Sequence, residues 1–452
     1  MNNRKASGIN RRSFLRSTAA VGAGLAISPV VFGQAAGQKK DDINVALLGT
    51  GTQGQVLLNA CLKIPNIRFR AVCDIWEAYN LKRVSNLLKK YKIEHNAYTD
   101  YKEMLDKQKD LDAVVIATPD FWHSEHSVAC LKAGLNVYCE KEMSNTIEGA
   151  KAMVQAARET GKLLQIGHQR RSNPRYIHCY DKIIKAAKLL GHITTINGQW
   201  NRGKASCEDF GWPKETDLDK ATLEKYGFES MHHFRNWRWF KKFGGGPIVD
   251  LGSHQIDVYA WFLEANPRSV IASGGVDYWK GHEWYDHVLA IYEYQTQQGM
   301  VRAFYQTITT NSGNGYFELF MGDEGSLLIS EATGRGETYR EAWLPEDHWD
   351  KWVQMGYLAA PVAEKKEEKP ADATGIEVYE SPKPPCFKLP VTLDKLVHQP
   401  HLENFFDAIR GKAKLNCPAE IGYETAVAVL KVNEAVEAGK KLDFKPEEFK
   451  VS

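Results

Sequence analysis

Short apolar runs alternate with segments of helical periodicity over about the first 170 residues of the chain. The runs end at glycine or polar residues, and the segments between them place apolar side chains on one helical face. This alternation favours an α/β fold with helices on both faces of a doubly wound parallel sheet. The predicted strands are Ile43–Leu48, Arg68–Cys73, Ala113–Ala117, Asn136–Cys139 and Leu163–Ile166, and the predicted helices are Gln53–Leu62, Ala78–Tyr91, Tyr101–Lys107, Ser124–Ala133 and Thr146–Thr160.

The pattern changes after about residue 190, where long strand-like segments follow one another with few helices between them. This succession predicts an α+β domain built on a large, mostly antiparallel, open sheet. The charged stretch 361–385 is expected to be a mobile surface insertion. The helices 400–410 and 421–439 are expected to close the chain, with the second packing back on the first domain. The predicted strands are Ile193–Arg202, Ser269–Tyr278, His287–Gln295, Met300–Thr309, Tyr316–Met321 and Ser326–Ile329.

The N-terminal segment reads as an export signal and not as part of the fold. Asn10–Arg16 contains an arginine pair, and a mild apolar run over 17–32 and Ala/Gly-rich residues to Gly37 follow it. This is the pattern of a bacterial twin-arginine signal peptide. Residues 1–37 are therefore predicted to be the signal, and the periplasm the destination. Resemblance to other substrates of the twin-arginine export machinery implies a protein that folds, often with its cofactor, before export.

Composition excludes several classes of protein. A chain of 452 residues with 43% hydrophobic and 25% charged residues is typical of a soluble globular protein with two domains. The formal charge is +2, of which residues 1–36 contribute +5, so the remainder has no nucleic-acid footprint. Outside the signal, no apolar run is long enough for a membrane span. The eight cysteines contain no CxxC pair, so we expect buried thiols and no metal site.

A glycine-rich turn joins the first predicted strand to the first predicted helix. Gly49-Thr50-Gly51-Thr52-Gln53-Gly54 has the G-x-G-x-x-G spacing of a dinucleotide-binding fingerprint, and predicts a Rossmann domain over residues 42–167. Gly49 would make the tight turn, Gly51 would admit the pyrophosphate, and Gly54 would let the helix pack on the strand. Thr52 and Gln53 complete the predicted cofactor-binding turn, at the helix N-terminus. The alternative is an ordinary turn between a strand and a helix.

Asp74 ends the second predicted strand, 20 residues after Gly54. A carboxylate at this point accepts hydrogen bonds from the ribose hydroxyls and repels a ribose phosphate, which favours NAD over NADP. The alternative interpretation of Asp74 is a surface helix cap.

Three further segments carry a family resemblance. They are Ala117–His123, Tyr138–Lys141 and Gly244–Asp257, which contains Gly-Gly-Gly-Pro and Asp-Leu-Gly-Ser-His. Together with the fingerprint they resemble the glucose-fructose oxidoreductase/inositol dehydrogenase (Gfo/Idh/MocA) family over about residues 42–445. The resemblance implies a second domain over 168–420 for substrate binding and oligomerisation, and a C-terminal helix over 421–445. It also implies a homodimer or homotetramer formed through the open face of the second sheet.

The family's catalytic set maps onto Lys141, Asp250 and His254. The last two are at positions i and i+4, so they share one face of a helix. An imidazole that titrates near neutrality suits the general base, which we assign to His254. Asp250 would orient the substrate or stabilise the charged imidazole, and Lys141 would polarise the substrate oxygen. The alternative for His254 is a core histidine with satisfied hydrogen bonds.

The resemblance also places residues around the nicotinamide. Pro119 and His123 resemble the family segment that lines the nicotinamide ribose, although His123 alone also fits a surface histidine. Arg171 begins a segment at the domain junction and would touch cofactor or substrate. The cofactor-binding residues implied in this part of the chain are Thr118, Pro119, His123, Glu140, Lys141 and Arg171.

One departure from the family pattern follows the lysine. Glu142 occupies the position where the family has proline. A cis bond that does not precede proline costs about 2.5–4 kcal/mol, so we expect any cis turn here to be strained or replaced. Glu142 would also be free to pair with Lys141 and lower its reactivity.

Aromatic and basic residues gather in 231–240 and near the end of the strand 193–202. Tryptophan faces with charged hydrogen-bonding groups suit sugars, whose C–H faces lie beside hydroxyls. The candidate substrate-binding residues are Trp200, Arg202, His233, Trp237, Asp250 and His254. The alternative is a structural aromatic cluster or a subunit interface.

The sequence thus predicts a periplasmic, NAD-dependent dehydrogenase. Its substrate would be a sugar or glycoside, oxidised at a ring hydroxyl, with C3 as the specific expectation, and its cofactor would be tightly held. Two alternatives stay open. One is a redox-neutral, NAD-dependent glycosidase that works by oxidation and elimination, and the other is a non-catalytic nicotinamide- or sugar-binding protein.

Overall fold

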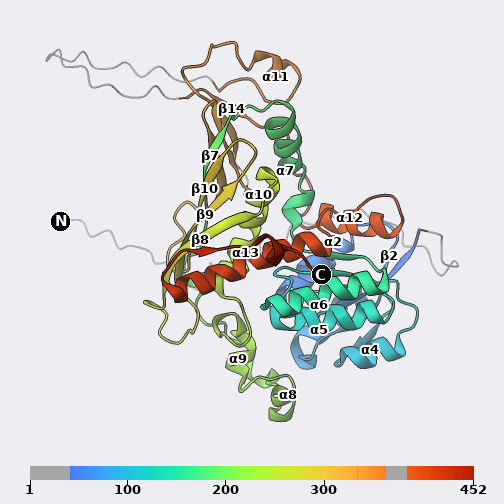
Figure 1. Ribbon diagram of the computed structural model, residues 1–452. Coiled ribbons are helices and arrows are strands. Elements are labelled where there is room, and N and C mark those ends of the chain that lie inside the picture. Colours follow the sequence, from blue (N-terminus) through green and yellow to red (C-terminus); the bar gives the residue numbers. More distant parts are fainter. Residues whose placement is uncertain (1–40, 333, 363–383) are drawn as a thin grey trace, which may run out of the picture. The chain divides into compact units, whose positions relative to one another are not determined.

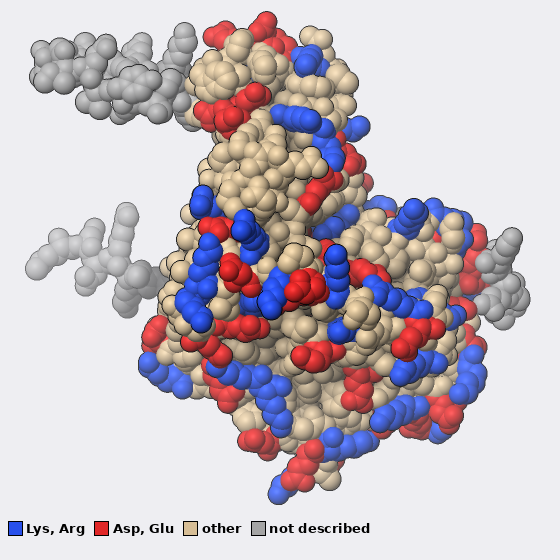
Figure 2. Space-filling view, in the orientation of Figure 1, with Lys and Arg blue, Asp and Glu red and all other residues tan. Residues whose placement is uncertain are grey.

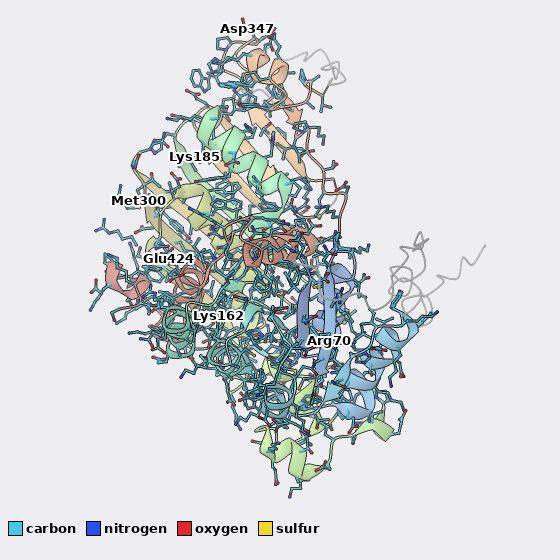
Figure 3. The ribbon with its side chains drawn as sticks, turned by 90° about the vertical axis from the view of Figure 1, so that its right-hand side faces the viewer. Arg70, Lys162, Lys185, Met300, Asp347 and Glu424 are labelled. Atoms are coloured by element: carbon cyan, nitrogen blue, oxygen red, sulfur yellow. The ribbon has the colours of Figure 1, made fainter. Side chains whose placement is uncertain are left out.

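The computed structural model describes residues 41–332, 334–362 and 384–452 (Figure 1). The signal predicted over 1–37 and most of the insertion predicted over 361–385 lie outside these residues. From Ile43 onward the chain forms one unit that contains two sheets. In the side view of Figure 3, Arg70 of β2 (Ile67–Cys73) marks the first sheet, and Met300, the first residue of β10 (Met300–Ile308), marks the second.

The first sheet confirms the doubly wound α/β prediction. Its parallel strands have the order β3-β2-β1-β4-β5-β6. Alternate residues of β1 pack into two different cores, Ala46 into one and Val45 into the other, which explains why the strands read as continuous apolar runs. The edge strand β3 was not predicted, because it is short and largely exposed. The strands are β1 Ile43–Leu48, β2 Ile67–Cys73, β3 Asn96–Tyr98, β4 Ala113–Ile116, β5 Asn136–Cys139 and β6 Leu164–Ile166.

Helices join these strands at the predicted places, with one informative shift. Helix α5 begins at Asp120, four residues before the predicted start, because Pro119 at its N-cap position already has the extended backbone that precedes a helix. The shift places Asp120 and His123 in the first turn, beside the edge of the sheet. The helices are α2 Thr52–Cys61, α3 Lys82–Lys90 after a π-helical turn Glu77–Leu81, α4 Tyr101–Lys107, α5 Asp120–Lys132 and α6 Ile147–Thr160.

The second sheet is large and mostly antiparallel, as predicted. Its order is β14-β13-β12-β11-β7-β10-β9-β8-β15, and β7 and β10 form its one parallel pair among the described residues. The short strands β13, β14 and β15 were not predicted. The strands are β7 Ile193–Asn201, β8 Pro267–Gly275, β9 His287–Gln295, β10 Met300–Ile308, β11 Tyr316–Gly322, β12 Gly325–Ile329, β13 Gly336–Arg340, β14 Cys386–Lys388 and β15 Leu442–Asp443.

The expectation of few helices in the second domain is wrong between β7 and β8. A π-helical turn, Ile248–Gly252, continues there into α10, which lies on the inner face of the sheet. The Tyr259 hydroxyl donates to the Phe304 carbonyl oxygen (3.0 Å), and Gly198 on β7 leaves room for that ring. The remaining helices are α7 Pro174–His178 with a π-helical continuation Cys179–Ala186, α8 Lys220–Lys225, α9 Met231–Arg235, α10 Ser253–Leu263, α11 Asp350–Gln354, α12 Gln399–Ile409 and α13 Ala419–Ala438.

Two parts of the chain connect the domains. Residues 204–243, which we term the crossing segment, contain α8 and α9 and reach the first domain. Trp76 of the first domain is fully buried, and its Nε1 donates to the carbonyl oxygen of Thr216 in the crossing segment (2.5 Å). Lys225 pairs with Asp100 (2.9 Å). Helix α13 lies against both α6 of the first domain and β8 of the second (Figure 1).

The described residues contain no helix with the length and apolarity that a membrane span requires. All eight cysteines lie in described parts of the chain, and all are free thiols. In the same parts, no three His, Cys, Asp or Glu side chains are grouped as metal ligands. Basic and acidic side chains are interspersed on the face shown in Figure 2.

Candidate functional site

A cavity of about 500 Å³ opens at the carboxyl edge of the first sheet. The loops after β1, β2, β4 and β5 form one side of it. The other side comes from the end of β7, the crossing segment and the beginning of α10. The predicted site residues that line it are Gly49, Gly51, Thr52, Gln53, Asp74, Thr118, Pro119, His123, Glu140, Lys141, Trp200, Arg202, Trp237, Asp250 and His254.

Three predicted site residues do not line this cavity. Gly54 lies beneath the turn, against Gly49. Arg171 was expected to touch cofactor or substrate, but its Nε donates to both carboxylate oxygens of buried Asp257 (2.9 and 3.0 Å). His233 was expected to bind substrate, but its ring packs on Phe240, with 4.2 Å between ring centroids. Arg171 and His233 therefore have structural contacts where a ligand contact was expected.

The glycine-rich turn forms a cradle that fits a dinucleotide. Gly49 has a φ of +91°, and a Cβ there would lie 2.6 Å from the Ala117 carbonyl oxygen. A Cβ on Gly54 would overlap the Gly49 carbonyl oxygen. A Cβ on Gly51, in contrast, would meet only Asn80 Nδ2 at 3.7 Å. Gly51 caps α2 without a side-chain hydrogen bond, so the helix N-terminus borders the cavity with room for phosphate oxygens.

Asp74 shapes this turn as well as lining the cavity. One of its carboxylate oxygens accepts hydrogen bonds from the Thr50 amide (2.7 Å) and hydroxyl (3.0 Å), and the other accepts one from the Trp76 amide (2.8 Å). Burial raises the pKa of Asp74, and these hydrogen bonds oppose the rise. Because it lines the cavity and holds the turn, Asp74 is not the surface cap that the sequence left open.

His123 is fully buried, so the surface interpretation of this histidine is wrong. Its Nδ1 lies 2.7 Å from the Glu142 carbonyl oxygen, and its Nε2 lies 2.7 Å from that of Thr118. Burial lowers the pKa of His123 to about 4, although both carbonyl contacts favour the charged ring. The imidazole connects the loop after β4 to the turn that carries Lys141.

Lys141 lies at the end of β5 and reaches across to the second domain. Its Nζ donates to the main-chain oxygen of Asp250 and lies 3.3 Å from the Asp250 carboxylate. The Lys141–Glu142 peptide bond is cis. Glu142 is buried, accepts a hydrogen bond from the Met143 amide (2.8 Å), and has a pKa raised to about 8 by burial. The partner of Lys141 in the described structure is thus Asp250, and the expected pair with Glu142 does not form.

Asp250 is surrounded by positive charge. One carboxylate oxygen of Asp250 faces Lys141. The other oxygen lies 3.7 Å from Arg238 Nε and 4.0 Å from Arg202 Nη1. Burial opposes ionisation of Asp250, but these three cations outweigh it and lower the pKa of the carboxyl. Asp250 is therefore a carboxylate throughout the physiological pH range.

His254 lines the cavity one helical turn after Asp250, but it does not titrate near neutrality as predicted. Burial, and then the charge of Lys141, hold its pKa well below the usual 6.5. Its Nδ1 is buried without a hydrogen-bond partner in the described residues. The Trp200 ring lies 5.5 Å away between centroids. The imidazole is thus neutral, and the interpretation as a core histidine with satisfied hydrogen bonds does not fit it.

Sequence reasoning missed three charged residues of the cavity, Asp120, Arg235 and Arg238. Asp120 is nearly buried in the first turn of α5, and burial together with the charge of Asp250 raises its pKa to about 7. Asp120 lies inside Ala117–His123, one of the segments that resemble the family, directly after Pro119. That position was the feature of the sequence that could have identified it. Arg235 and Arg238 both lie within the aromatic stretch 231–240, where nothing in the sequence marked either as a cavity residue.

Two family descriptions match the chain in the order that the motifs predict. Residues 43–168 match the oxidoreductase family with an NAD-binding Rossmann fold, and residues 219–328 match the GFO/IDH/MocA C-terminal domain. Together they cover just over half of the chain. The first domain is therefore an NAD-binding Rossmann domain.

Characterised relatives are distant. Inositol 2-dehydrogenase of Rubrobacter xylanophilus is 23% identical over 340 residues, which is 70% of this chain and 82% of that protein. 1,5-Anhydro-D-fructose reductase of Ensifer adhaerens is 29% identical over 50% of this chain and 59% of its own length. Alpha-N-acetylgalactosaminidase of Tannerella forsythia is 32% identical over 177 residues, 34% of this chain and 38% of that protein. In the last two matches, the chain spans less than two thirds of the relative's own length.

A solved structure of levoglucosan dehydrogenase in complex with NADH shares the fold. The TM-score is 0.64 at 17% identity, and the match covers 89% of this chain and 99% of that one.

We predict that Gly51→Ala weakens NAD binding by about tenfold or more, equivalent to about 1.4 kcal/mol. The added methyl group has room in the free protein but enters the space next to the helix N-terminus. Titration calorimetry measures the affinity, and the melting temperature is expected to stay unchanged. Gly281→Ala, whose new Cβ meets nothing within 4 Å, is the matched control. Equal NAD affinity in Gly51→Ala and the wild type would contradict the cradle.

Proposed function

Because the chain belongs to the Gfo/Idh/MocA oxidoreductase family, we propose that it oxidises a ring hydroxyl of a sugar, polyol or glycoside with NAD. One observation carries the proposal: a dinucleotide cradle and the Lys141, Asp250 and His254 side chains line the same cavity. The position oxidised is proposed to be C3, on the resemblance described above.

The residues of the first domain would hold the cofactor. The glycine-rich turn and the α2 N-terminus suit the pyrophosphate, and Asp74 suits the ribose hydroxyls. Thr118, Pro119 and Glu140 line the same cavity next to Lys141. When bound, NAD⁺ supplies the two-electron oxidant for the alcohol.

The side chains of the cavity manage the hydroxyl proton. Lys141, oriented by its ion pair with Asp250, donates a hydrogen bond to the substrate oxygen and stabilises its developing negative charge. A neighbouring group must accept the proton as the alcohol becomes a carbonyl. Neutral His254 can accept it, but at a cost, because its surroundings disfavour the charged ring. Asp120, with a pKa of about 7, is better matched to accept it at neutral pH.

The protein is further proposed to act in the periplasm with a tightly held cofactor. The twin-arginine motif supports export in a folded state. Retention of the cofactor is supported by the crossing segment, which contributes Phe234 and Trp237 to the cavity that the glycine-rich turn borders. Its contacts with Trp76 and Asp100 fix it to the first domain.

The outer face of the second sheet supports a homo-oligomer. Ile271 pairs with Ile291, and Ile291 with Phe304, across β8, β9 and β10. Ile271 and Ile291 are each 44% exposed, and neighbouring Leu289 is 40% exposed. Adjacent exposed aliphatic side chains on an open sheet are typical of a subunit interface. We propose a homodimer or homotetramer formed through this apolar row, Ile271, Ile291 and Phe304 with Leu289.

A second candidate is a redox-neutral glycosidase, favoured by the 32% identity with alpha-N-acetylgalactosaminidase. Oxidation at C3 acidifies the adjacent C–H, a base removes that proton, and the aglycone leaves with formation of a carbon–carbon double bond. Water then adds across this bond, and the hydride removed in the first step reduces the carbonyl again. Asp120 or His254 would serve as that base. A non-catalytic binding protein would show neither reaction.

The deciding experiment follows absorbance of the reduced nicotinamide while NAD-loaded protein meets glucosides, galactosides and inositols. Accumulation of NADH with one sugar class supports the dehydrogenase. Release of aglycone without NADH supports the glycosidase. If neither product forms while a sugar still binds, the protein is a binding protein.

We predict that His254→Ala lowers kcat by about 10²–10⁴-fold, the usual contribution of a positioned acid–base group. Its melting temperature and NAD affinity are expected to remain close to those of the wild type. The exposed His348 provides the control His348→Ala, which should leave kcat unchanged. A kcat within threefold of wild type in His254→Ala would remove this residue from the mechanism.

The pH dependence of kcat should report Asp120. Its pKa is raised to about 7, so the proton-accepting carboxylate forms as pH rises, and kcat should increase through about pH 7 and then level off. Asp120→Asn should lower kcat and remove this inflection. His254→Ala should keep it, because His254 does not titrate there. A pH profile of Asp120→Asn with the same inflection would assign the titration to another group.

For the oligomer, the double substitution Ile271→Lys with Ile291→Lys should yield monomers. Charged side chains opposite each other on β8 and β9 cannot be buried in an apolar interface. Sedimentation velocity measures the mass, and Met355→Lys, at a 58% exposed methionine beside α11, is the control. An unchanged mass in the double variant would place the interface elsewhere.

A further inference from the structure

We propose that the substrate carries an oxyanion, such as a carboxylate, sulfate or phosphate group on the sugar, and that Arg202 and Arg238 bind it. This inference rests on the proposed function and narrows its substrate class.

The two arginines approach the same place from different elements. Arg202 follows the last residue of β7, and Arg238 lies in the short turn Trp237–Trp239 of the crossing segment. Both line the cavity that contains Lys141 and Asp250. Each side chain is 37% exposed, although the carboxylate between them is largely covered.

Neither guanidinium has a hydrogen-bond partner of its own among the described residues. The nearest carboxylate oxygen is the same Asp250 oxygen for both, at 4.0 Å from Arg202 and 3.7 Å from Arg238. These separations exceed a hydrogen bond. Lys141 already lies against the main-chain oxygen and the other carboxylate oxygen of Asp250. The donors of both arginines are therefore left for a ligand.

The charges next to the reacting position do not balance. Lys141, Arg202 and Arg238 are three cations that face the same carboxylate, Asp250. Asp120 is only partly ionised near neutrality. Uncompensated charge in a partly enclosed site is costly, and an anionic ligand would offset it.

Three arginines elsewhere in the second-domain core do have hydrogen-bonded partners, which makes the contrast informative. Arg170 is held between Glu318 and Glu331, and Arg171 is held by Asp257. Arg175 donates to the main-chain oxygens of Ser330 and Arg335. These structural arginines make hydrogen bonds, whereas the guanidinium groups of Arg202 and Arg238 make none to the described residues and only face Asp250 at a distance.

Each free arginine is also held over a tryptophan. The Arg202 Cζ lies 5.4 Å from the Trp200 ring centroid, and the Arg238 Cζ lies 4.4 Å from that of Trp237. Such contacts fix the side chain and leave its N–H groups available. A guanidinium held in this way suits two-point binding of a carboxylate, sulfate or phosphate group. A neutral hydroxyl would use only one donor of each.

The cofactor's own phosphates are the competing occupant. The glycine-rich turn and the α2 N-terminus already form a cradle for them in the first domain. If the arginines served the cofactor, their replacement would weaken NAD binding. If they serve the substrate, NAD affinity would be unchanged.

The test compares matched neutral and anionic sugars on the full-length, NAD-loaded protein. The pairs are 4-nitrophenyl glucoside with the glucuronide, 4-nitrophenyl galactoside with the galacturonide, and galactose with its 6-sulfate and 6-phosphate. NADH formation and nitrophenol release are both recorded, so that either reaction is detected. The variants are Arg202→Gln and Arg238→Gln, with Arg70→Gln, at a surface arginine of β2, as control.

We expect kcat/KM for one anionic sugar to exceed that of its neutral partner by about tenfold or more. Each arginine substitution should lower that value by about 10–100-fold, the equivalent of one charged hydrogen-bonding group, mainly through KM. The value for the neutral sugar should change less than threefold, and the Kd for NAD should not change. The three anionic groups distinguish carboxylate from sulfate and phosphate recognition.

Calorimetric titration of the same sugars separates failure of this inference from failure of the proposed function. Turnover of neutral sugars alone, with no tighter binding of any anionic partner, would overturn the inference and keep the function. Binding of an anionic sugar that needs both arginines, without any turnover, would support the inference and overturn the function. Loss of NAD affinity in the variants would assign the arginines to the cofactor and overturn the inference.

Discussion

The ion pair between Lys141 and Asp250 is the constraint on which the rest of the site depends. Each domain contributes one charge, and neither is saturated without the other. On the first-domain side, Lys141 lies in a turn whose Glu142 carbonyl oxygen contacts His123. The same imidazole also contacts the Thr118 carbonyl oxygen, in the loop after β4. Asp250 is held because α10 is anchored to β10 through Tyr259. The two sides of the cavity are thus joined where these two separately supported elements form their ion pair.

Local physical rules made much of the first domain predictable. The strands β1, β4 and β5 are buried on both faces, so their sequences are continuous apolar runs without alternating polar residues. Such runs are typical of strands in a parallel sheet. The glycine-rich turn was equally readable, since Gly49 and Gly54 occupy positions where a side chain would collide with the main chain. Membership of a known family then identified Lys141, Asp250 and His254, which spacing alone would not have brought together.

The remaining features depend on the surroundings of a residue and not on its neighbours in the chain. His254 was expected to titrate near neutrality, but burial and a lysine more than a hundred residues earlier decide its charge. Arg171 was expected in the cavity, but Asp257 on a distant helix binds it. Asp120 acquires its raised pKa from the same kind of long-range placement. A sequence pattern does not reveal the burial and the neighbouring charges that set these pKa values, because the fold brings the groups together from distant parts of the chain.

The burial of Trp76 has a consequence for how the protein is made. Its indole nitrogen is satisfied by the Thr216 carbonyl, 140 residues later, and aromatic rings of the crossing segment surround it. On the ribosome, the strands of the first sheet are all synthesised before that segment emerges. Until then, Trp76 lacks the groups of the crossing segment that bury its ring in the folded protein. The incomplete chain therefore exposes an apolar surface around Trp76 of the kind that chaperones bind. The aromatic cluster that covers this surface is complete only after Phe243 has been translated.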